Sequence, residues 1–182
     1  IDVVSGVEVR ADDPSQAGGF VGAHRDRHPL VLVHGGDPEL NRFAVEQAAV
    51  DVLAHPMVDS GGFNHVLART ARENGVRGEF KLRRVLRAEG GRRVQALSDL
   101  RRLWELVDTY DTPYVVSADP RSHLQLRAPR ELQAVGDVVG LPEAAVEHGL
   151  AEWGRLAERN RARDSDAFVE PGVWRVSEDD GR

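Results

Sequence analysis

Short apolar runs alternate with helical patterns along the chain, and this alternation limits the available folds more than any other feature of the sequence. The clearest run is Leu-Val-Leu-Val-His at residues 30–34. A continuous apolar run of this length is typical of a strand that is buried on both faces. We expect five strands, in the ranges 3–9, 30–34, 50–55, 76–82 and 114–118.

Capping residues between these runs mark where helices begin and end. Asp37 followed by Pro38 predicts a helix start, because Asp caps the first turn and Pro fits its first position. Asn64 predicts a second helix start, and Gly75 predicts the end of that helix in a left-handed conformation. Further helices are expected over residues 97–110, over residues 129–139 and from residue 142 onwards.

Strand–helix alternation at this rhythm predicts βαβ units and a parallel sheet. We expect an α/β fold, a TIM-like (β/α) barrel that lacks its N-terminal strands, because eight strands close such a barrel and five are evident. The chain starts at Ile1 rather than Met, so the missing strands are expected before it. An open doubly wound sheet is the alternative. We expect one domain over residues 1–162 and a polar tail over residues 163–182.

The composition narrows the class of protein. The chain has 182 residues, a net charge of -6 and no cysteine, which excludes a disulfide framework, a thiolate zinc site and a cysteine nucleophile. No apolar run is long enough to span a membrane, so we expect a soluble, cytoplasmic protein with no membrane partner. No G-x-G-x-x-G or Walker A sequence supports nucleotide binding.

Arginine supplies nearly all of the positive charge, because Lys81 is the single lysine of the chain. An excess of acids combined with so little lysine indicates a high-salt cytoplasm, where carboxylates hold water well and lysine stems add apolar surface. A GC-rich genome that encodes Arg in place of Lys is the alternative explanation.

Several residues that could carry chemistry lie at the predicted carboxyl ends of the strands, where function gathers in parallel α/β folds. His34, His55 and Asp119 could together hold a metal ion, as in a metal-dependent hydrolase. The two histidines could equally hydrogen-bond neighbouring backbone. The remaining strand-end candidates are Glu8, Arg10, Glu79, Lys81 and Ser117, with His123 shortly after the last strand.

Basic residues concentrate in one part of this acidic chain. Residues 77–102 contain nine basic and three acidic side chains. A second group consists of Arg121, Arg127 and Arg130. A run of charge is often only a solvated face. Arginine forks also bind phosphates and stack on bases, which suits RNA.

Five stretches of the sequence resemble the archaeal ribonuclease P protein component 3 family, the family of the thirty-kilodalton ribonuclease P subunit. They follow one another in register over roughly residues 1–160. The stretches are DVLAHP at 51–56, NHVLA at 64–68, ENGVR at 73–77 running into FKLR at 80–83, YVVSAD at 114–119, and LRAPREL at 126–132.

The resemblance implies a barrel related to the metal-dependent PHP phosphoesterases and amidohydrolases. It also implies a subunit of the ribonucleoprotein that removes 5′ leaders from precursor tRNA, where the RNA subunit cleaves with its own Mg²⁺. The expected partners are the ribonuclease P RNA, ribonuclease P protein component 2 and other ribonuclease P proteins. No catalytic residue and no cofactor is then expected on the protein. The candidate RNA contacts are Lys81, Arg83, Arg84, Arg87, Arg121, Arg127 and Arg130.

Three functions therefore remain open from the sequence. The first is a non-catalytic, RNA-binding subunit of ribonuclease P. The second is a PHP-like metal-dependent phosphoesterase with His34, His55 and Asp119 as ligands. The third is a protein–protein scaffold whose basic segment meets an acidic partner.

Overall fold

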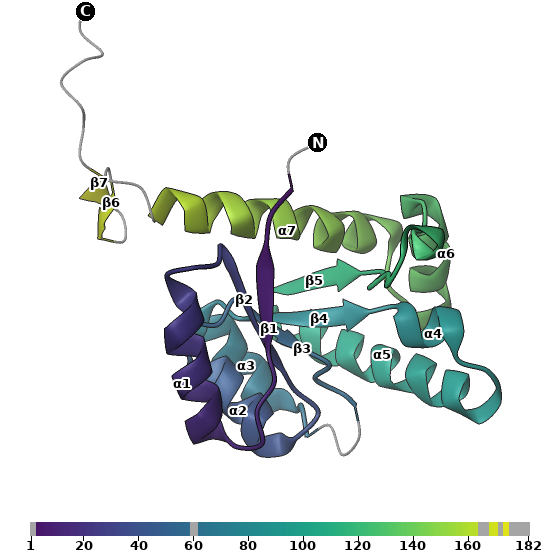
Figure 1. The fold of residues 1–182 in the computed structure, drawn as a ribbon. Helices are drawn as coiled ribbons and strands as arrows, with labels where there is room; N and C mark the ends of the chain where they lie inside the picture. The colour runs from purple at the N-terminus through teal and green to yellow at the C-terminus, as the bar shows by residue number, and fades with distance from the viewer. Residues whose placement is uncertain (1–2, 59–61, 164–167, 171–172, 175–182) are drawn as a thin grey trace, which may run out of the picture.

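Five parallel strands form the main sheet of the computed structural model, which describes residues 3–58, 62–163, 168–170 and 173–174 (Figure 1). Each strand is short and follows one of the apolar runs. The strands are β1 (Gly6–Val9), β2 (Leu30–His34), β3 (Val52–Ala54), β4 (Arg77–Lys81) and β5 (Tyr114–Ser117).

The five strands lie in the sheet in the order in which they occur in the sequence. A doubly wound sheet reverses its strand order at a switch point, and no such reversal occurs among these five strands. β1 and β5 are the two edges, so the described strands form an open sheet. The α/β class and the parallel sheet are confirmed, whereas the expected barrel, which was predicted to lack its N-terminal strands, is not confirmed by the five described strands.

Helices connect consecutive strands, as βαβ geometry requires. Asp37 caps α2 (Pro38–Glu46) through hydrogen bonds from two backbone N–H groups, and Asn64 caps α3 (His65–Asn74) in the same way. Gly75 ends α3 in the left-handed conformation, as predicted. The helices are α1 (Pro14–Arg25), α2 (Pro38–Glu46), α3 (His65–Asn74), α4 (Arg83–Arg87), α5 (Gly90–Tyr110), α6 (Pro129–Val139) and α7 (Glu143–Arg163), with a short 3₁₀ turn, η1 (His123–Gln125).

The two faces of the sheet are covered differently. On the outer face, Val31 and Val33 of β2 belong to the large core that also contains side chains of α2, α3 and α5. On the inner face, Leu30 of β2 packs with Val115 of β5 and Leu156 of α7. Figure 1 shows α7 as one long helix that runs beside β5 and past the beginning of β1. Among the described helices, α7 is therefore the one that covers the inner face.

Two of the helices, α1 and α4, were not predicted from the sequence. α1 contains three glycines and buries only Ala17 and Val21, so its helical pattern is weak and packing on β1 and β2 decides its conformation. α4 is a single short turn, and α5 begins at Gly90 rather than at residue 97. The strands were placed correctly, although most are one to three residues shorter than expected at an end.

The last part of the chain was expected to be a polar tail. β6 (Phe168–Glu170) and β7 (Val173–Trp174) pair there in antiparallel fashion. The other residues of the expected tail after α7 lie outside the described residues. Within the described ranges, no helix combines the length and the apolar run that crossing a bilayer requires.

Candidate functional site

Polar side chains gather at the carboxyl end of the inner face. Register partners in a parallel sheet share a face, and so do alternate residues along a strand. Leu32 and Val115 pack on the inner face, and they are paired with Glu8 and Glu79 respectively. By the same alternation of side chains along each strand, five polar side chains point to this end of the inner face. They are Glu8, His34, Glu79, Lys81 and Ser117. We call these five residues, together with His55 and Asp119, the carboxyl-end cluster.

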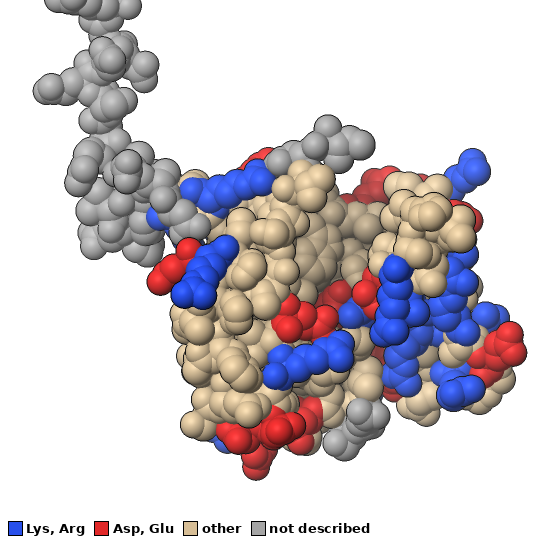
Figure 2. All heavy atoms as spheres, in the orientation of Figure 1, with Lys and Arg blue, Asp and Glu red and all other residues tan. Residues whose placement is uncertain are grey.

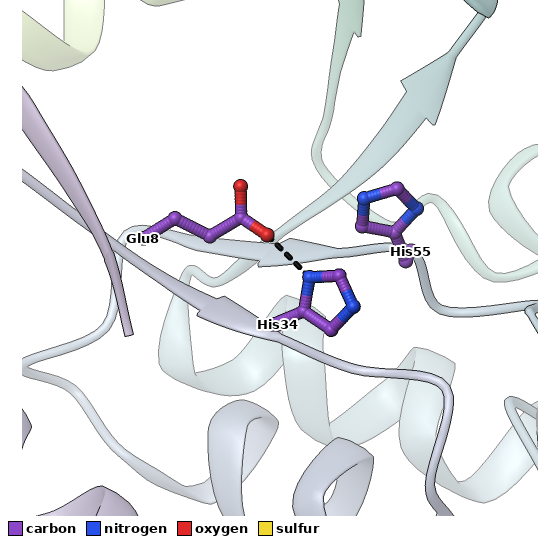
Figure 3. Close-up of side chains that lie close together, drawn as sticks. All are labelled: Glu8, His34 and His55. Carbon is purple, nitrogen blue, oxygen red and sulfur yellow. Dashed lines mark hydrogen bonds and ion pairs between the residues drawn. The ribbon is translucent and has the colours of Figure 1, made fainter. Parts of the chain in front are cut away.

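Three members of the cluster lie close enough to share one ion. Glu8 from β1, His34 from the end of β2 and His55 just after β3 each offer a ligand atom, and these atoms all lie within 4.8 Å of one another. The carboxylate of Glu8 makes a short hydrogen bond with Nδ1 of His34 (Figure 3). The rings of His34 and His55 lie 4.5 Å apart, centroid to centroid. Carboxylate oxygen and imidazole nitrogen are typical ligands of zinc.

Lys81 of β4 places its ammonium group among these side chains. Its Nζ lies 2.8 Å from Nε2 of His55 and 3.5 Å from Oδ2 of Asp119. The carboxylates of Glu8 and Glu79 are each 3.9 Å away. The three potential ligands therefore fit a metal ion less well, because the Lys81 ammonium already hydrogen-bonds to His55 and pairs with Glu8.

Glu79 is the most buried acid of the cluster, with a side chain that is 4% exposed. Its Oε1 accepts a hydrogen bond of 2.7 Å from the hydroxyl of Ser117. Its Oε2 is buried and accepts no hydrogen bond. The cluster therefore contains a buried carboxylate oxygen that lacks a hydrogen-bond donor and has the Lys81 ammonium 3.9 Å away.

Burial and neighbouring charges shift the pKa values of three members of the cluster. The hydrogen bond from His34 lowers the pKa of Glu8 to about 2, with a further contribution from Lys81. Burial, followed by the charge of Lys81, lowers the pKa of His55 to about 4. Burial raises the pKa of Glu79. At neutral pH, Glu8 is therefore a carboxylate and His55 is neutral, so Nε2 of His55 can accept a hydrogen bond from the Lys81 ammonium.

Two residues of the cluster have an unusual backbone conformation. His55 and Asp119 follow the ends of β3 and β5, and their φ angles are 57° and 44°. Positive φ is uncommon for residues other than glycine, and it tends to occur at functional sites where surrounding structure holds it in place. The side chains of both residues contact the ammonium of Lys81.

The structure brings together His34 and His55, two of the three predicted metal ligands, but Asp119 takes a different place. Its carboxylate pairs with Lys81, and Glu8 is the third residue of the potential ion-binding group. Glu8 was noted as a strand-end residue but was not included in the ligand set. The alternation of side chains along the strands could have identified it, because Glu8 lies on the same face of the sheet as His34.

The predicted RNA-contact residues on α4 form part of a basic surface next to the cluster. Arg83, Arg84 and Arg87 line a hollow together with Arg92 from the first turn of α5. Figure 2 shows basic side chains gathered on this side of the molecule, over α4 and the adjoining end of α5. Arg84 is partly neutralised by Asp99, at 3.4 Å, whereas Arg87 and Arg92 are exposed.

A hydrogen bond joins this surface to the second group of arginines. Nη1 of Arg83 donates to Oε1 of Gln125, at 2.6 Å, and to the backbone oxygen of Asp119. The backbone N–H of Arg121 donates to the same Gln125 oxygen. We call Arg83, Arg84, Arg87, Arg92 and Arg121 the arginine surface, and we include in the name Arg127 and Arg130, which follow Arg121 along the chain and are half-buried and exposed respectively. Gln125, which connects its two halves, was missed because nothing local in the sequence marks it.

Lys81 does not belong to the arginine surface, although it was predicted as an RNA contact. Its side chain is only 10% exposed, and its ammonium faces the carboxyl-end cluster. The alternation of side chains along β4 explains this position, because Lys81 points to the inner face with Glu79.

Comparisons with known proteins identify the family of the chain. The model of the family described as RNase P subunit p30 matches residues 1–165. Ribonuclease P protein component 3 of Haloarcula marismortui is 59% identical over 173 residues, which cover 95% of this chain and 74% of that protein. The component 3 protein of Natronomonas pharaonis is 60% identical over 181 residues, which cover 100% of this chain and 75% of that protein.

A solved structure is similar as well. One chain of a cryo-EM structure of archaeal ribonuclease P with mature tRNA superimposes with a TM-score of 0.85, covering 98% of this chain and 78% of that chain at 27% sequence identity. The family model covers most of the chain, and both the sequence and the fold agree with it. The chain therefore belongs to the RNase P subunit p30 family.

Proposed function

We propose that this protein acts within archaeal ribonuclease P by binding RNA with its arginine surface, while the RNA performs the cleavage. Family membership makes the chain a protein subunit of ribonuclease P, the ribonucleoprotein that processes precursor tRNA. The observation that carries the RNA-binding role is the arginine surface, where two basic segments distant in sequence meet through Gln125.

The chemistry of the surface suits a phosphate backbone. Guanidinium groups bind phosphate oxygens with two parallel hydrogen bonds and remain charged at any physiological pH. Arg87 and Arg92 are exposed beside one hollow, so both are accessible to a ligand. Arg130 lies in the first turn of α6, where the helix dipole also favours an anion.

Exchange of arginine for alanine tests this role. We expect the double variant Arg127→Ala/Arg130→Ala to bind ribonuclease P RNA more weakly by about 1–3 kcal/mol, and the double variant Arg87→Ala/Arg92→Ala to behave similarly. Each lost phosphate contact should also reduce the slope of log K against log salt by about 0.9. The matched control is Arg42→Ala, which removes an exposed arginine of α2 outside the surface.

Filter binding over a series of KCl concentrations measures both quantities. Unchanged affinity and unchanged salt slope in both double variants would show that the arginine surface does not bind RNA. Retained assembly with the protein partner but no RNA crosslinks from residues 77–130 would favour the scaffold function instead.

The protein partner and the metal requirement form a second part of the proposal. We expect ribonuclease P protein component 2 to bind this chain, and Mg²⁺ to be held by the RNA rather than by the protein. The complex is expected to act in the cytoplasm. Reconstitution tests this part, because adding both proteins to the RNA should lower the Mg²⁺ concentration needed for cleavage of precursor tRNA. Cleavage that is indifferent to the proteins would contradict it.

We also propose that the five-stranded sheet is part of a PHP-type barrel. Three features support closure, namely consecutive parallel order, helices on the outer face and polar residues at the carboxyl ends of the strands. In a closed barrel the free edge of β1 would pair with another strand. Hydrogen exchange should then show slow exchange for the β1 amides that point away from β2, and rapid exchange of these amides would argue against a barrel.

A metal-dependent phosphoesterase with His34, His55 and Asp119 as ligands is the less well supported alternative. The proximity of Glu8, His34 and His55 favours it, whereas the position of Lys81 opposes it. Hydrolysis of bis-p-nitrophenyl phosphate with added Mn²⁺, abolished by His55→Ala, would establish this activity. Absence of hydrolysis would leave the RNA-binding function.

A further inference from the structure

The Lys81 ammonium lies at the meeting point of side chains from several strands. It contacts His55 after β3, Asp119 after β5, Glu79 of its own strand and Glu8 of β1, all within 3.9 Å. The Lys81 side chain is 10% exposed, so its charge interacts with these groups with little competition from water.

The surrounding groups are those that would bind a divalent cation. Glu8, His34 and His55 direct a carboxylate oxygen and two imidazole nitrogens at one small volume (Figure 3). Nε2 of His55, one of the two ring nitrogens that could bind a metal ion, lies 2.8 Å from the ammonium.

The cluster contains more acceptors than one lysine can satisfy. An ammonium group has three N–H donors, and four side chains compete for them. Oε2 of Glu79 is buried, accepts no hydrogen bond and lies 3.9 Å from Nζ of Lys81. One singly charged ammonium therefore leaves a buried Glu79 oxygen without a hydrogen-bond donor, close to three potential metal ligands. We expect such an arrangement where a singly charged group takes the place of a doubly charged ion.

We propose that Lys81 is a built-in cation that takes the place of a metal ion in the carboxyl-end cluster, and that removal of its ammonium opens a zinc-binding site. The covalently attached cation neutralises the carboxylates without a bound metal. Its hydrogen bond to Nε2 of His55 also competes with a metal ion for that nitrogen, so we expect the wild-type protein not to bind zinc at this position. The ligands of the opened site are Glu8, His34 and His55.

Zinc binding to Lys81→Ala tests the proposal. Equilibrium dialysis against ZnCl₂ with metal analysis should give about one zinc per chain for Lys81→Ala and almost none for the wild type. Adding His55→Ala to this variant should weaken zinc binding by at least about 10-fold. The matched control is Arg92→Ala, which removes an exposed cation outside the cluster and should bind no zinc.

A second variant and a second measurement cover the case in which loss of the buried charge prevents folding. Lys81→Met keeps most of the length of the side chain without its charge, and circular dichroism follows refolding of both variants with and without zinc. Recovery of the native spectrum only with zinc would support the proposal. Failure of both variants to bind zinc, or to refold with it, would overturn it. Stoichiometric zinc binding by the wild type that is lost in His55→Ala would also overturn it.

Discussion

The two ends of the sheet differ in how completely their buried carboxylates are hydrogen-bonded. At the amino end, Asp51 precedes β3 and its carboxylate accepts four hydrogen bonds of 2.7–2.9 Å. The donors are Arg25, the backbone N–H of Val31, Arg159 and Asn160. At the carboxyl end, Oε2 of Glu79 is equally buried but accepts none.

The two ends of the sheet also differ in backbone conformation. His55 and Asp119 have positive φ angles at the carboxyl end, and Asp111 is the only other such non-glycine residue in the described part of the chain. A fully paired buried ion contributes to stability or costs little, whereas an incompletely paired one costs free energy. We infer that the amino end holds the fold together and that the carboxyl end keeps polar groups at a cost in stability. This division between the two ends is typical of (β/α) barrels.

The largest expected effect is at the amino end. Asp51→Asn replaces a carboxylate that is 2% exposed, and it leaves two arginines without their counterion. We expect the free energy of unfolding to fall by about 3 kcal/mol, because both arginines are partly exposed and can regain some hydration. Urea denaturation measures this difference. The control is Glu46→Gln, which breaks the exposed pair with Arg42 and should cost less than about 0.5 kcal/mol.

The next effect concerns the attachment of α7, the helix that delivers Arg159 and Asn160 to Asp51. A Cβ on Gly149 would lie 2.5 Å from Cγ2 of Val116 and 3.0 Å from the backbone of β5. We expect Gly149→Ala to lower the free energy of unfolding by about 1–3 kcal/mol, because the helix must move away from the strand.

Gly154 provides the matched control on the same helix. A Cβ there meets nothing within 4 Å, so Gly154→Ala should stabilise the protein by about 0.5–1 kcal/mol through helix propensity. Equal effects of the two substitutions in thermal or urea unfolding would show that α7 does not pack closely on β5.

A smaller effect is expected at the carboxyl end. Glu79→Gln keeps an oxygen that can accept the Ser117 hydrogen bond, and it removes a buried charge that is incompletely paired. We expect the free energy of unfolding to change by no more than about 1 kcal/mol. A decrease in the free energy of unfolding as large as that expected for Asp51→Asn would contradict the proposed difference between the two ends of the sheet.

The smallest expected effect is the pH dependence of the difference in stability between Glu79→Gln and the wild type. Burial raises the pKa of Glu79, so the folded state binds this proton more tightly than the unfolded state does. The stability that this proton contributes is present below the unfolded pKa, near 4.3, and is lost as the pH rises through the higher folded value. The free energy of unfolding of Glu79→Gln, relative to that of the wild type, should therefore increase as the pH rises above about 4. Parallel curves for the two proteins in urea denaturation would contradict this prediction.

Much of the fold could be predicted because its signals are local. The run at residues 30–34 and the caps Asp37 and Asn64 act on neighbouring backbone, and all three were found where they were expected. α1 could not be predicted in this way, because its three glycines weaken the helical pattern and its helix depends on contacts with the sheet.

The candidate site was predicted less completely. His34 and His55 were recognised by their positions at strand ends, and the structure brings them together. The position of Lys81 was not anticipated, because a lysine in a basic stretch resembles its arginine neighbours until it is known which face of the sheet each β4 side chain points to. The RNA-binding role of the arginines stays a prediction.

The sequence by itself determined the α/β class, the caps and the position of each strand, since these depend on the periodicity and chemistry of adjacent residues. Only the tertiary structure decided which polar groups meet. Glu8 and His34 are 26 residues apart, as are His55 and Lys81, and Asp51 lies 109 residues from Asn160. Register and helix packing set these contacts, so one acid is fully paired at one end of the sheet and another is left with an unmet oxygen at the other.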